Sequence, residues 1–274
     1  MVSICDILVV SRAGFYAWRH EAESARAQRD RELVPLIHEI FWKHKRRYGA
    51  RRIAVELAAL GHKCGVERVA KLLKTAGLQA IQPQSFHPKT TDSRHTLGYS
   101  PNLLANVPSL TTINQVWVTD ITYIPLQSPG FAYLALAMDL FSRRIVGWEL
   151  AEHMEELLVI DALQQAIRNR QPPPGLIHHS DRGGQYAGHR YRAILRRAEI
   201  RQSMSRAANC YDNAFMESCF GTIKTELEMT EYEDKSLARS DIARYLTYYN
   251  YERRHSALDY LSPHQFECIQ AELH

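Results

Sequence analysis

The first third of the chain carries apolar residues at helical spacing. Apolar positions recur every three or four residues in several segments, with polar residues between them, which is typical of amphipathic helices. This spacing predicts helices over residues 22–45, 53–60 and 66–76. Residues 1–20 predict two short helices around a turn, either a helix-turn-helix or a plain helical hairpin. We therefore predict a small, all-helical, helix-turn-helix-like domain over residues 1–80, with DNA binding as its expected role.

A second segment shows no periodicity. Residues 81–112 contain four prolines among Ser, Thr and Asn, a composition that favours an extended connection over a helix or strand. We predict a linker here, one that could lie along the surface of the next domain.

From Gln115 onward the pattern is that of strands followed by alternating helices and strands. Segments rich in β-branched and aromatic residues predict strands over residues 115–126, 131–141, 144–150, 176–180 and 201–204. The first three are joined by short connections and predict an antiparallel meander. Helical spacing predicts helices over residues 155–170, 189–198 and 209–227. This order predicts an α/β core domain over residues 113–228, followed by a C-terminal helical extension over 229–274.

Composition excludes some protein classes. The longest uncharged apolar run, residues 131–138, is far shorter than the roughly 20 residues that a membrane helix needs. No basic segment is followed by an apolar run and a cleavage site, so we expect no secretion signal and no membrane partner. The five cysteines form no CxxC pair, which fits a reducing compartment such as the cytoplasm.

Charge is unevenly distributed along the chain. Residues 1–95 contain 17 Lys/Arg and 9 Asp/Glu, a balance of +8, whereas the remainder has 17 and 21, a balance of −4. A basic N-terminal third suggests a polyanionic partner, and an acidic remainder suits cation binding. The densest basic segment surrounds Tyr48, and its candidate phosphate contacts are Lys45, Arg46, Arg47, Arg51 and Arg52. The alternative is a solvated helix start.

Three acids are the candidates for chemistry. Asp120 lies inside a predicted strand, where Asp is disfavoured, and Asp181 follows a short apolar run just before two glycines. Glu217 lies in a predicted helix, where Asn213 and Lys224 project from the same side. Carboxylates on two strands and one helix could hold two hard cations such as Mg²⁺, which prefer oxygen ligands. Such a pair of ions catalyses in-line phosphoryl transfer.

These acids stand in motifs that resemble a known family. The motifs are WVTDIT at 117–122, HSDRG at 179–183, NCYDN at 209–213, and then Glu217 and Lys224. They are similar to the Asp-Asp-Glu signature of retroviral-integrase-type transposases, and more narrowly to the OrfB proteins of family-three bacterial insertion sequences. The flanking motifs YGARRI at 48–53, RHSAL at 254–258 and LSP at 261–263 extend the resemblance over nearly the whole chain.

The resemblance implies a fold, an activity and partners. The expected fold is a ribonuclease-H-like integrase core, with a five-stranded mixed sheet and flanking helices. Asp120, Asp181 and Glu217 would be catalytic and would bind two Mg²⁺, with Mn²⁺ as a substitute. The expected reaction is strand cleavage and strand transfer at the ends of an insertion sequence. Expected partners are double-stranded DNA with terminal repeats, further copies of the chain, and an upstream OrfA protein or an OrfA–OrfB fusion.

Residues around the triad have weaker assignments. We expect Lys224 to hold DNA near the metals and Asn213 to orient Glu217 or contact DNA. Arg253 and Arg254, after the last long helix, could contact phosphate or belong to a solvated turn. Asp139, at the end of a predicted strand, is expected to be structural. His178 and His179 are consecutive strand residues, so at most one of them can face the carboxylates.

Two other functions remain open from sequence. A non-catalytic DNA-binding regulator would use the basic N-terminal domain and keep the acidic domain for self-association. A ribonuclease-H-like nuclease would cut nucleic acid without joining ends. Metal-dependent nicking distinguishes the first of these from a transposase, and a joined product distinguishes the second.

Overall fold

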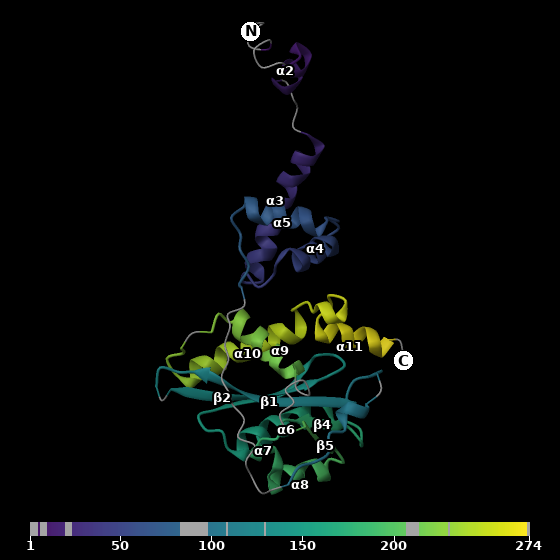
Figure 1. The fold of residues 1–274 in the computed structure, drawn as a ribbon, viewed down its shortest axis with the longest axis vertical. Helices are drawn as coiled ribbons and strands as arrows, with labels where there is room; N and C mark the ends of the chain where they lie inside the picture. The colour runs from purple at the N-terminus through teal and green to yellow at the C-terminus, as the bar shows by residue number, and fades with distance from the viewer. Residues whose placement is uncertain are drawn as a thin grey trace. The chain divides into compact units, whose positions relative to one another are not determined.

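A computed structural model describes most of the chain in two compact units. The described residues are 5, 10–19, 24–82, 98–107, 109–128, 130–206, 214–229 and 231–272 (Figure 1). One unit comprises Met1–Ile81 and the other Gln82–His274. None of the described helices is long and apolar enough to cross a membrane.

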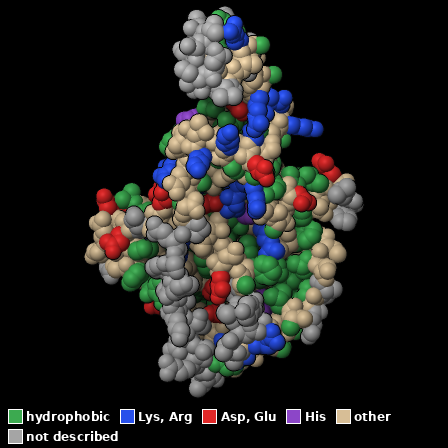
Figure 2. Space-filling model, turned by 45° about the horizontal axis from the view of Figure 1, so that its top comes forward, with side chains coloured by type: hydrophobic (Ala, Val, Ile, Leu, Met, Phe, Trp, Pro, Cys, Tyr) green, Lys and Arg blue, Asp and Glu red, His purple; other side chains and the backbone are tan. Residues whose placement is uncertain are grey.

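The first unit is helical, as its sequence predicts. Its helices are α2 (Arg12–Arg19), α3 (Ala25–Lys43), α4 (Ala50–Ala59) and α5 (Val66–Thr75). Ser24 caps α3 by accepting a hydrogen bond from the Ala27 backbone N–H at 3.2 Å. The buried faces of α3, α4 and α5 supply the core, which includes Leu33, Ile37, Phe41, Ile53, Leu57 and Val69. Lys and Arg side chains of this unit gather on the face drawn in Figure 2.

The second unit is built on a five-stranded mixed sheet. Its strands are β1 (Val116–Pro125), β2 (Phe131–Asp139), β3 (Ile145–Ala151), β4 (Ile177–Ser180) and β5 (Arg201–Met204), in the order β3-β2-β1-β4-β5. β1, β2 and β3 pair antiparallel, whereas β4 pairs parallel with both β1 and β5. The predicted meander and the two later strands are confirmed.

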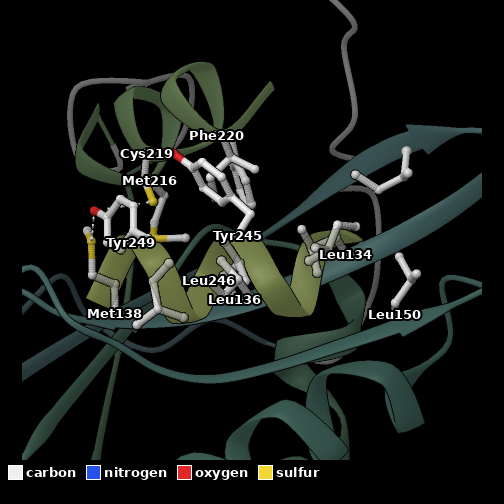
Figure 3. Close-up of a cluster of buried hydrophobic side chains, with 14 of the residues drawn as sticks. Leu134, Leu136, Met138, Leu150, Met216, Cys219, Phe220, Tyr245, Leu246 and Tyr249 are labelled. Carbon is white, nitrogen blue, oxygen red and sulfur yellow. Dashed lines mark hydrogen bonds between the residues drawn. The ribbon is translucent and has the colours of Figure 1, made fainter. Parts of the chain in front are cut away.

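Helices cover both faces of this sheet, because its central strands are apolar on both sides (Figure 1). One face packs against α9 (Ala214–Glu226) and α10 (Lys235–Tyr251). In Figure 3, Leu134, Leu136 and Met138 of β2 lie against Tyr245, Leu246 and Tyr249 of α10. α10 therefore completes the same hydrophobic core as the sheet.

The opposite face packs against α6 (Glu156–Arg170), α7 (Gly184–Ala187) and α8 (His189–Arg197). α6 approaches β3 very closely at Gly147, where an added Cβ would lie 2.3 Å from the Ala162 carbonyl oxygen. Only glycine fits this contact without displacing the helix.

The C-terminal helix is fastened by a buried charge. Glu267 on α11 (Pro263–Glu272) is 8% exposed and binds Arg170 at 2.8 Å and Arg144 at 2.5 Å. Ser142 donates a further hydrogen bond to Glu267 at 2.7 Å. This network joins α11, the end of α6 and the β2–β3 connection. A short 3-10 helix, η3 (Ser256–Leu258), precedes α11.

Part of the predicted linker follows the edge of the sheet. The Leu103 N–H donates to Ser203 Oγ at 2.9 Å, and Ser100 Oγ donates to Gln202 Oε1 at 2.8 Å. This segment then continues into a 3-10 helix, η1 (Leu104–Asn106). Residues 98–103 therefore cover β5, which would otherwise be an open edge strand.

Candidate active site

Asp120 and Asp181 come from neighbouring parallel strands. In the β1–β4 pair, Val118 lies opposite His179, so continuing the register by two residues places Asp120 beside Asp181 at the point where β4 ends. Neighbouring strands lie about 4.8 Å apart, and residues paired in this way point to the same face. Val118 belongs to the core beneath α9, so this face is the one that α9 covers.

Glu217 reaches that face from the first turn of α9. The buried side of the helix, formed by Met216, Phe220 and Ile223, packs on the sheet. Glu217 is exposed beside this buried side. The apolar spacing of α9 thus fixes the helix and leaves the carboxylate outside the core.

Electrostatics link the three acids. Burial is the largest cause that raises the pKa of Asp120 well above its usual value, and the Asp181 carboxylate raises it further. A hydrogen bond from the Ile121 backbone N–H lowers the pKa, and the Glu217 carboxylate raises it again. Like charges therefore meet at Asp120, and a cation placed among them would relieve their repulsion.

The acids do not form a finished metal cage. Across the described part of the chain, no three Asp, Glu, His or Cys side chains are arranged to hold a metal ion. Asp181 Oδ1 accepts the Gly183 backbone N–H at 3.0 Å, which orients it at the turn after β4. The structure brings the three acids within electrostatic range of one another.

The two histidines before Asp181 face opposite ways, as strand alternation predicts. His179 lies on the α9 face, where its ring is held by Ser203 Oγ at 2.8 Å and Ser205 Oγ at 3.2 Å. His178 points to the other face and bonds with the Tyr191 hydroxyl at 3.1 Å. Burial, and to a smaller extent the neighbouring His179, lowers the pKa of His178 to about 3, so His178 is neutral.

Arg182 is a neighbour that sequence reasoning did not single out. Its Nε donates to the Ser205 carbonyl at 2.8 Å, and its guanidinium lies 4.5 Å from the centre of the Tyr99 ring. The segment that covers β5 therefore also fixes the residue next to Asp181. Its position inside the HSDRG motif, directly after Asp181, could have identified Arg182 as a residue of the site from the sequence alone.

Lys224 and Asn213 were both expected beside Glu217. Lys224 is part-buried on the last turns of α9, and burial lowers its pKa to about 8. It stands two turns beyond Glu217 on nearly the same side of the helix. Asn213 lies outside the described residues.

Arg253 has a different environment from the one expected of a DNA contact. It is 4% exposed, and its guanidinium binds the Glu226 carboxylate at 2.7–3.0 Å. This placement argues against phosphate contact, because the side chain is enclosed and already paired. Arg254 is part-buried and donates to the Tyr260 carbonyl at 2.9 Å.

Asp139 is structural, as expected. It is fully buried and accepts backbone N–H groups from Asn114 at 2.6 Å, Phe141 at 3.0 Å and Ser142 at 2.9 Å. It shapes the turn after β2 and contributes nothing to the triad.

The basic residues of the first unit lie where α3 gives way to α4. Lys45 and Arg46 have positive φ angles of 49° and 62°, so they form a left-handed turn. Lys45 and Arg51 are exposed, and Arg46, Arg47 and Arg52 are part-buried. Tyr48 is fully buried, and the Arg52 guanidinium lies 5.5 Å from its ring centre. The aromatic residue anchors the turn and the cations stay toward the surface.

A mixed sheet of this order, covered by helices on both faces and carrying acids on β1, after β4 and on α9, defines the integrase-type, ribonuclease-H-like class. Family models agree. Residues 111–210 and 198–263 match two models described as "Integrase core domain", and residues 28–86 match an "HTH-like domain". The helix-turn-helix-like match thus covers α3, α4 and α5 and begins after residues 1–20, where the sequence allowed a helix-turn-helix.

Relatives identify the family. A 31 kDa protein of insertion element IS600 from Shigella sonnei is 42% identical over 96% of this chain and 97% of its own length. Transposase InsF for insertion sequence IS3A from Escherichia coli (strain K12) is 38% identical over 97% of this chain and 93% of its own length. The chain belongs to the IS3 family of insertion-sequence transposases.

A solved structure shows the same fold. A chain in the structure of the simian T-cell lymphotropic virus intasome in complex with PP2A regulatory subunit B56 gamma is similar, with a TM-score of 0.50. The likeness covers 85% of this chain and 74% of that one at 15% identity, and at this identity it shows the fold alone.

Proposed function

We propose that Asp120, Asp181 and Glu217 hold two Mg²⁺ ions while this transposase cleaves and joins DNA strands at the ends of its insertion sequence. The observation that supports the proposal is electrostatic: Asp181, which follows β4 beside Asp120, and Glu217 on α9 both raise the pKa of Asp120. Mn²⁺ is a suitable substitute, since it accepts the same oxygen ligands.

The donor set suits such ions. All three ligands are carboxylates, and hard cations such as Mg²⁺ prefer oxygen and keep several waters, so few protein ligands are needed. A bound cation would offset the repulsion that Asp181 and Glu217 exert on the Asp120 carboxylate, and this favours cation binding. Glu217 is exposed on its helix and therefore has room to close on the aspartates.

Each residue contributes a separate task. Asp120 and Asp181 are fixed by strand pairing and by hydrogen bonds from Ile121 and Gly183, so they form the rigid side of the site. Glu217 completes it from α9. When bound, two metal ions activate a water or a 3′-hydroxyl and stabilise the leaving oxygen of an in-line displacement. No covalent bond between protein and DNA is required.

DNA would be held by cations outside the triad. We assign phosphate contacts to Lys224 near the carboxylates and to Lys45, Arg46, Arg47, Arg51 and Arg52 in the helical unit. Arg254 is a weaker candidate, and the placement of Arg253 favours a structural role. We further propose that several copies assemble on DNA, and that an OrfA protein or an OrfA–OrfB fusion supplies additional DNA binding.

The test is strand transfer by Asp181→Asn protein on labelled duplexes that carry the terminal repeats of the insertion sequence. We expect strand transfer to fall by about three orders of magnitude or more, because the metals stabilise several kcal/mol of developing charge. DNA binding should stay near the wild-type level. Unchanged strand transfer would remove Asp181 from the active site.

The same assay separates the other functions. A wild-type protein that binds DNA but shows no Mg²⁺- or Mn²⁺-dependent nicking would be a regulator. One that nicks without forming a joined product would be a nuclease. Both results contradict the proposed function.

A further inference from the structure

α8 is an unusually basic helix in the otherwise acidic part of the chain. Its nine residues, HRYRAILRR, include four arginines and one histidine and no acid. Tyr191 and Leu195 are buried and anchor the helix to the sheet, while Arg190, Arg196 and Arg197 are exposed. Among the residues that the structure describes, no ion pair involves an arginine of α8.

A cavity of about 330 Å³ opens between α8 and the segment that covers β5. Three of its lining side chains are basic, namely His189, Arg192 and Arg196, and two are polar, Ser100 and Gln202. Its size is at the lower end of the range for ligand sites, roughly 300–1,000 Å³. A cavity with this lining suits a phosphate group.

Arg192 is only partly satisfied at this cavity. One terminal nitrogen donates to the Gly98 carbonyl at 2.7 Å, but Nε is buried and has no hydrogen-bond partner among the described residues. Nε is enclosed by the protein, so an acceptor in the cavity would reach it only after the side chain turned. A phosphate oxygen is the acceptor that arginine geometry fits best.

The helix dipole favours the positions of only two of the four arginines of α8. Arg196 and Arg197 lie in the last turn, where the helix dipole favours positive charge. Arg190 and Arg192 lie in the first turn, where it opposes positive charge. Glu156 lies at this end of the helix and accepts the Tyr191 backbone N–H at 3.0 Å. One carboxylate that already caps the helix leaves most of the local positive charge uncompensated, and Glu199 adds one acid beyond the helix end.

We propose that α8 and this cavity form a second DNA-contact surface, one that binds the phosphodiester backbone of duplex DNA outside the carboxylate site. Arg192 and Arg196 would contact phosphates at the cavity, and Arg190 and Arg197 would extend the contact along the helix. The surface reads no bases, because its groups are cationic and suited to phosphate.

The cavity is joined to the active-site end of the sheet. The side-chain amide of Gln202 donates to the carbonyl of Tyr186 at 2.6 Å, and Tyr186 lies on α7, the short helix that follows Asp181. α7 therefore connects the turn after Asp181 with the wall of this cavity. This link to the reaction rests on the proposed function, whereas DNA binding by α8 does not.

The experiment measures affinity for a labelled duplex by fluorescence anisotropy over a range of salt concentrations, in EDTA and with full-length protein. Arg192→Gln/Arg196→Gln is the test variant. Arg168→Gln/Arg244→Gln is the matched control, since it removes two exposed arginines elsewhere in the same unit. The slope of log K against log salt is about −0.9 for each phosphate neutralised, so the test variant should lose roughly 1.8 from its magnitude.

We expect the test variant to bind DNA at least about tenfold more weakly at low salt, with the control close to wild type. An unchanged slope and affinity, or an equal loss in the control, would overturn the proposal. Arg196→Gln alone guards against misfolding, because Arg196 is exposed; it should lose about 0.9 in slope, and Arg196→Lys should restore much of it.

One further result is decisive. Inorganic phosphate or a mononucleotide could bind the cavity of the wild-type protein while the arginine variants keep wild-type DNA affinity. This result would make the cavity a small-anion site and would reject the DNA surface. Because the assay contains no divalent metal, it gives the same answer whether or not the Asp-Asp-Glu assignment holds.

Discussion

The two glutamates of α9 lie in opposite electrostatic surroundings. Glu226 is 7% exposed; it accepts three hydrogen bonds from the Arg253 guanidinium and one from the Tyr245 hydroxyl at 3.0 Å. Glu217, nine residues earlier and therefore half a turn around the helix, is exposed and stands near other carboxylates. Glu226 is therefore neutralised and hydrogen-bonded within the protein, whereas Glu217 stands near carboxylates of the same charge.

This difference separates structure from function on a single helix. A buried carboxylate whose cation and donors are all supplied by the chain fixes α9 to the segment after α10. A carboxylate near other acids is repelled by them and does not stabilise the fold in this way. Such a carboxylate is suited to binding a cation. In the proposed function, this ion pair holds the helix from which Glu217 would join Asp120 and Asp181.

The largest expected effect comes from making the same change at both positions. Glu217→Gln should lower strand transfer by about three orders of magnitude or more, because a metal ligand is lost. Its thermal unfolding midpoint should equal or exceed that of wild type, since a repelling charge is removed. Strand transfer and differential scanning calorimetry on the same preparation measure both.

Glu226→Gln should give the reverse pattern. It leaves Arg253 buried beside a neutral amide, which should cost about 3–5 kcal/mol of unfolding free energy, while the folded fraction keeps its chemistry. If both variants lose activity and stability to the same extent, the contrast between the two ends of α9 is wrong.

The fold was largely predictable because its signals are local. Alternation and β-branched residues mark β1, and three- and four-residue spacing marks α3, α6 and α10. Short connections predict the antiparallel meander, and Asp139 was placed correctly because an Asp at a strand end receives turn hydrogen bonds.

The site was less predictable because its contacts are not local. The pairing of β1 with β4, which sets Asp120 beside Asp181, joins segments about 60 residues apart in the chain. Spacing gave three isolated acids, and only the family motifs joined them. Arg253 has a partner 27 residues away, so its burial leaves no mark in the sequence around it.

The second prediction breaks the ion pair from its other side. Arg253→Met should lower the unfolding free energy by about 3–5 kcal/mol, because Glu226 is then buried without its cation. The double variant Arg253→Met/Glu226→Gln should recover most of that loss, since no uncompensated charge remains. Urea unfolding of the two single variants and the double variant forms the cycle. A double variant less stable than Arg253→Met would contradict the account.

The third prediction concerns Asp139, an acid that resembles the triad in sequence but not in surroundings. Asp139→Ala should lower the unfolding free energy by about 1–3 kcal/mol, because buried N–H groups at the β2–β3 turn lose their acceptor. Divalent-metal binding, measured by isothermal titration, should be unchanged in the folded protein. Loss of metal binding there would place Asp139 in the site.

The smallest expected effect is a pH dependence at Lys224. Burial lowers its pKa to about 8, so the side chain is mainly charged at pH 7 and mainly neutral at pH 9.5. DNA affinity in EDTA should therefore fall by up to about fivefold over this range, the effect of losing about 1 kcal/mol of phosphate contact. Lys224→Arg keeps its charge throughout and should show a flat profile.

The effect of Lys224 on folding stability has the opposite pH dependence to its effect on DNA affinity. Because the folded pKa lies below the unfolded value of 10.5, the unfolded chain binds the proton more tightly, and the cost of burying the charge is present below about pH 8. This cost disappears as pH rises from about 8 toward 10.5, so stability relative to Lys224→Arg should rise there while DNA affinity falls. If affinity and stability fell together, loss of the folded state and not loss of a phosphate contact would explain the profile.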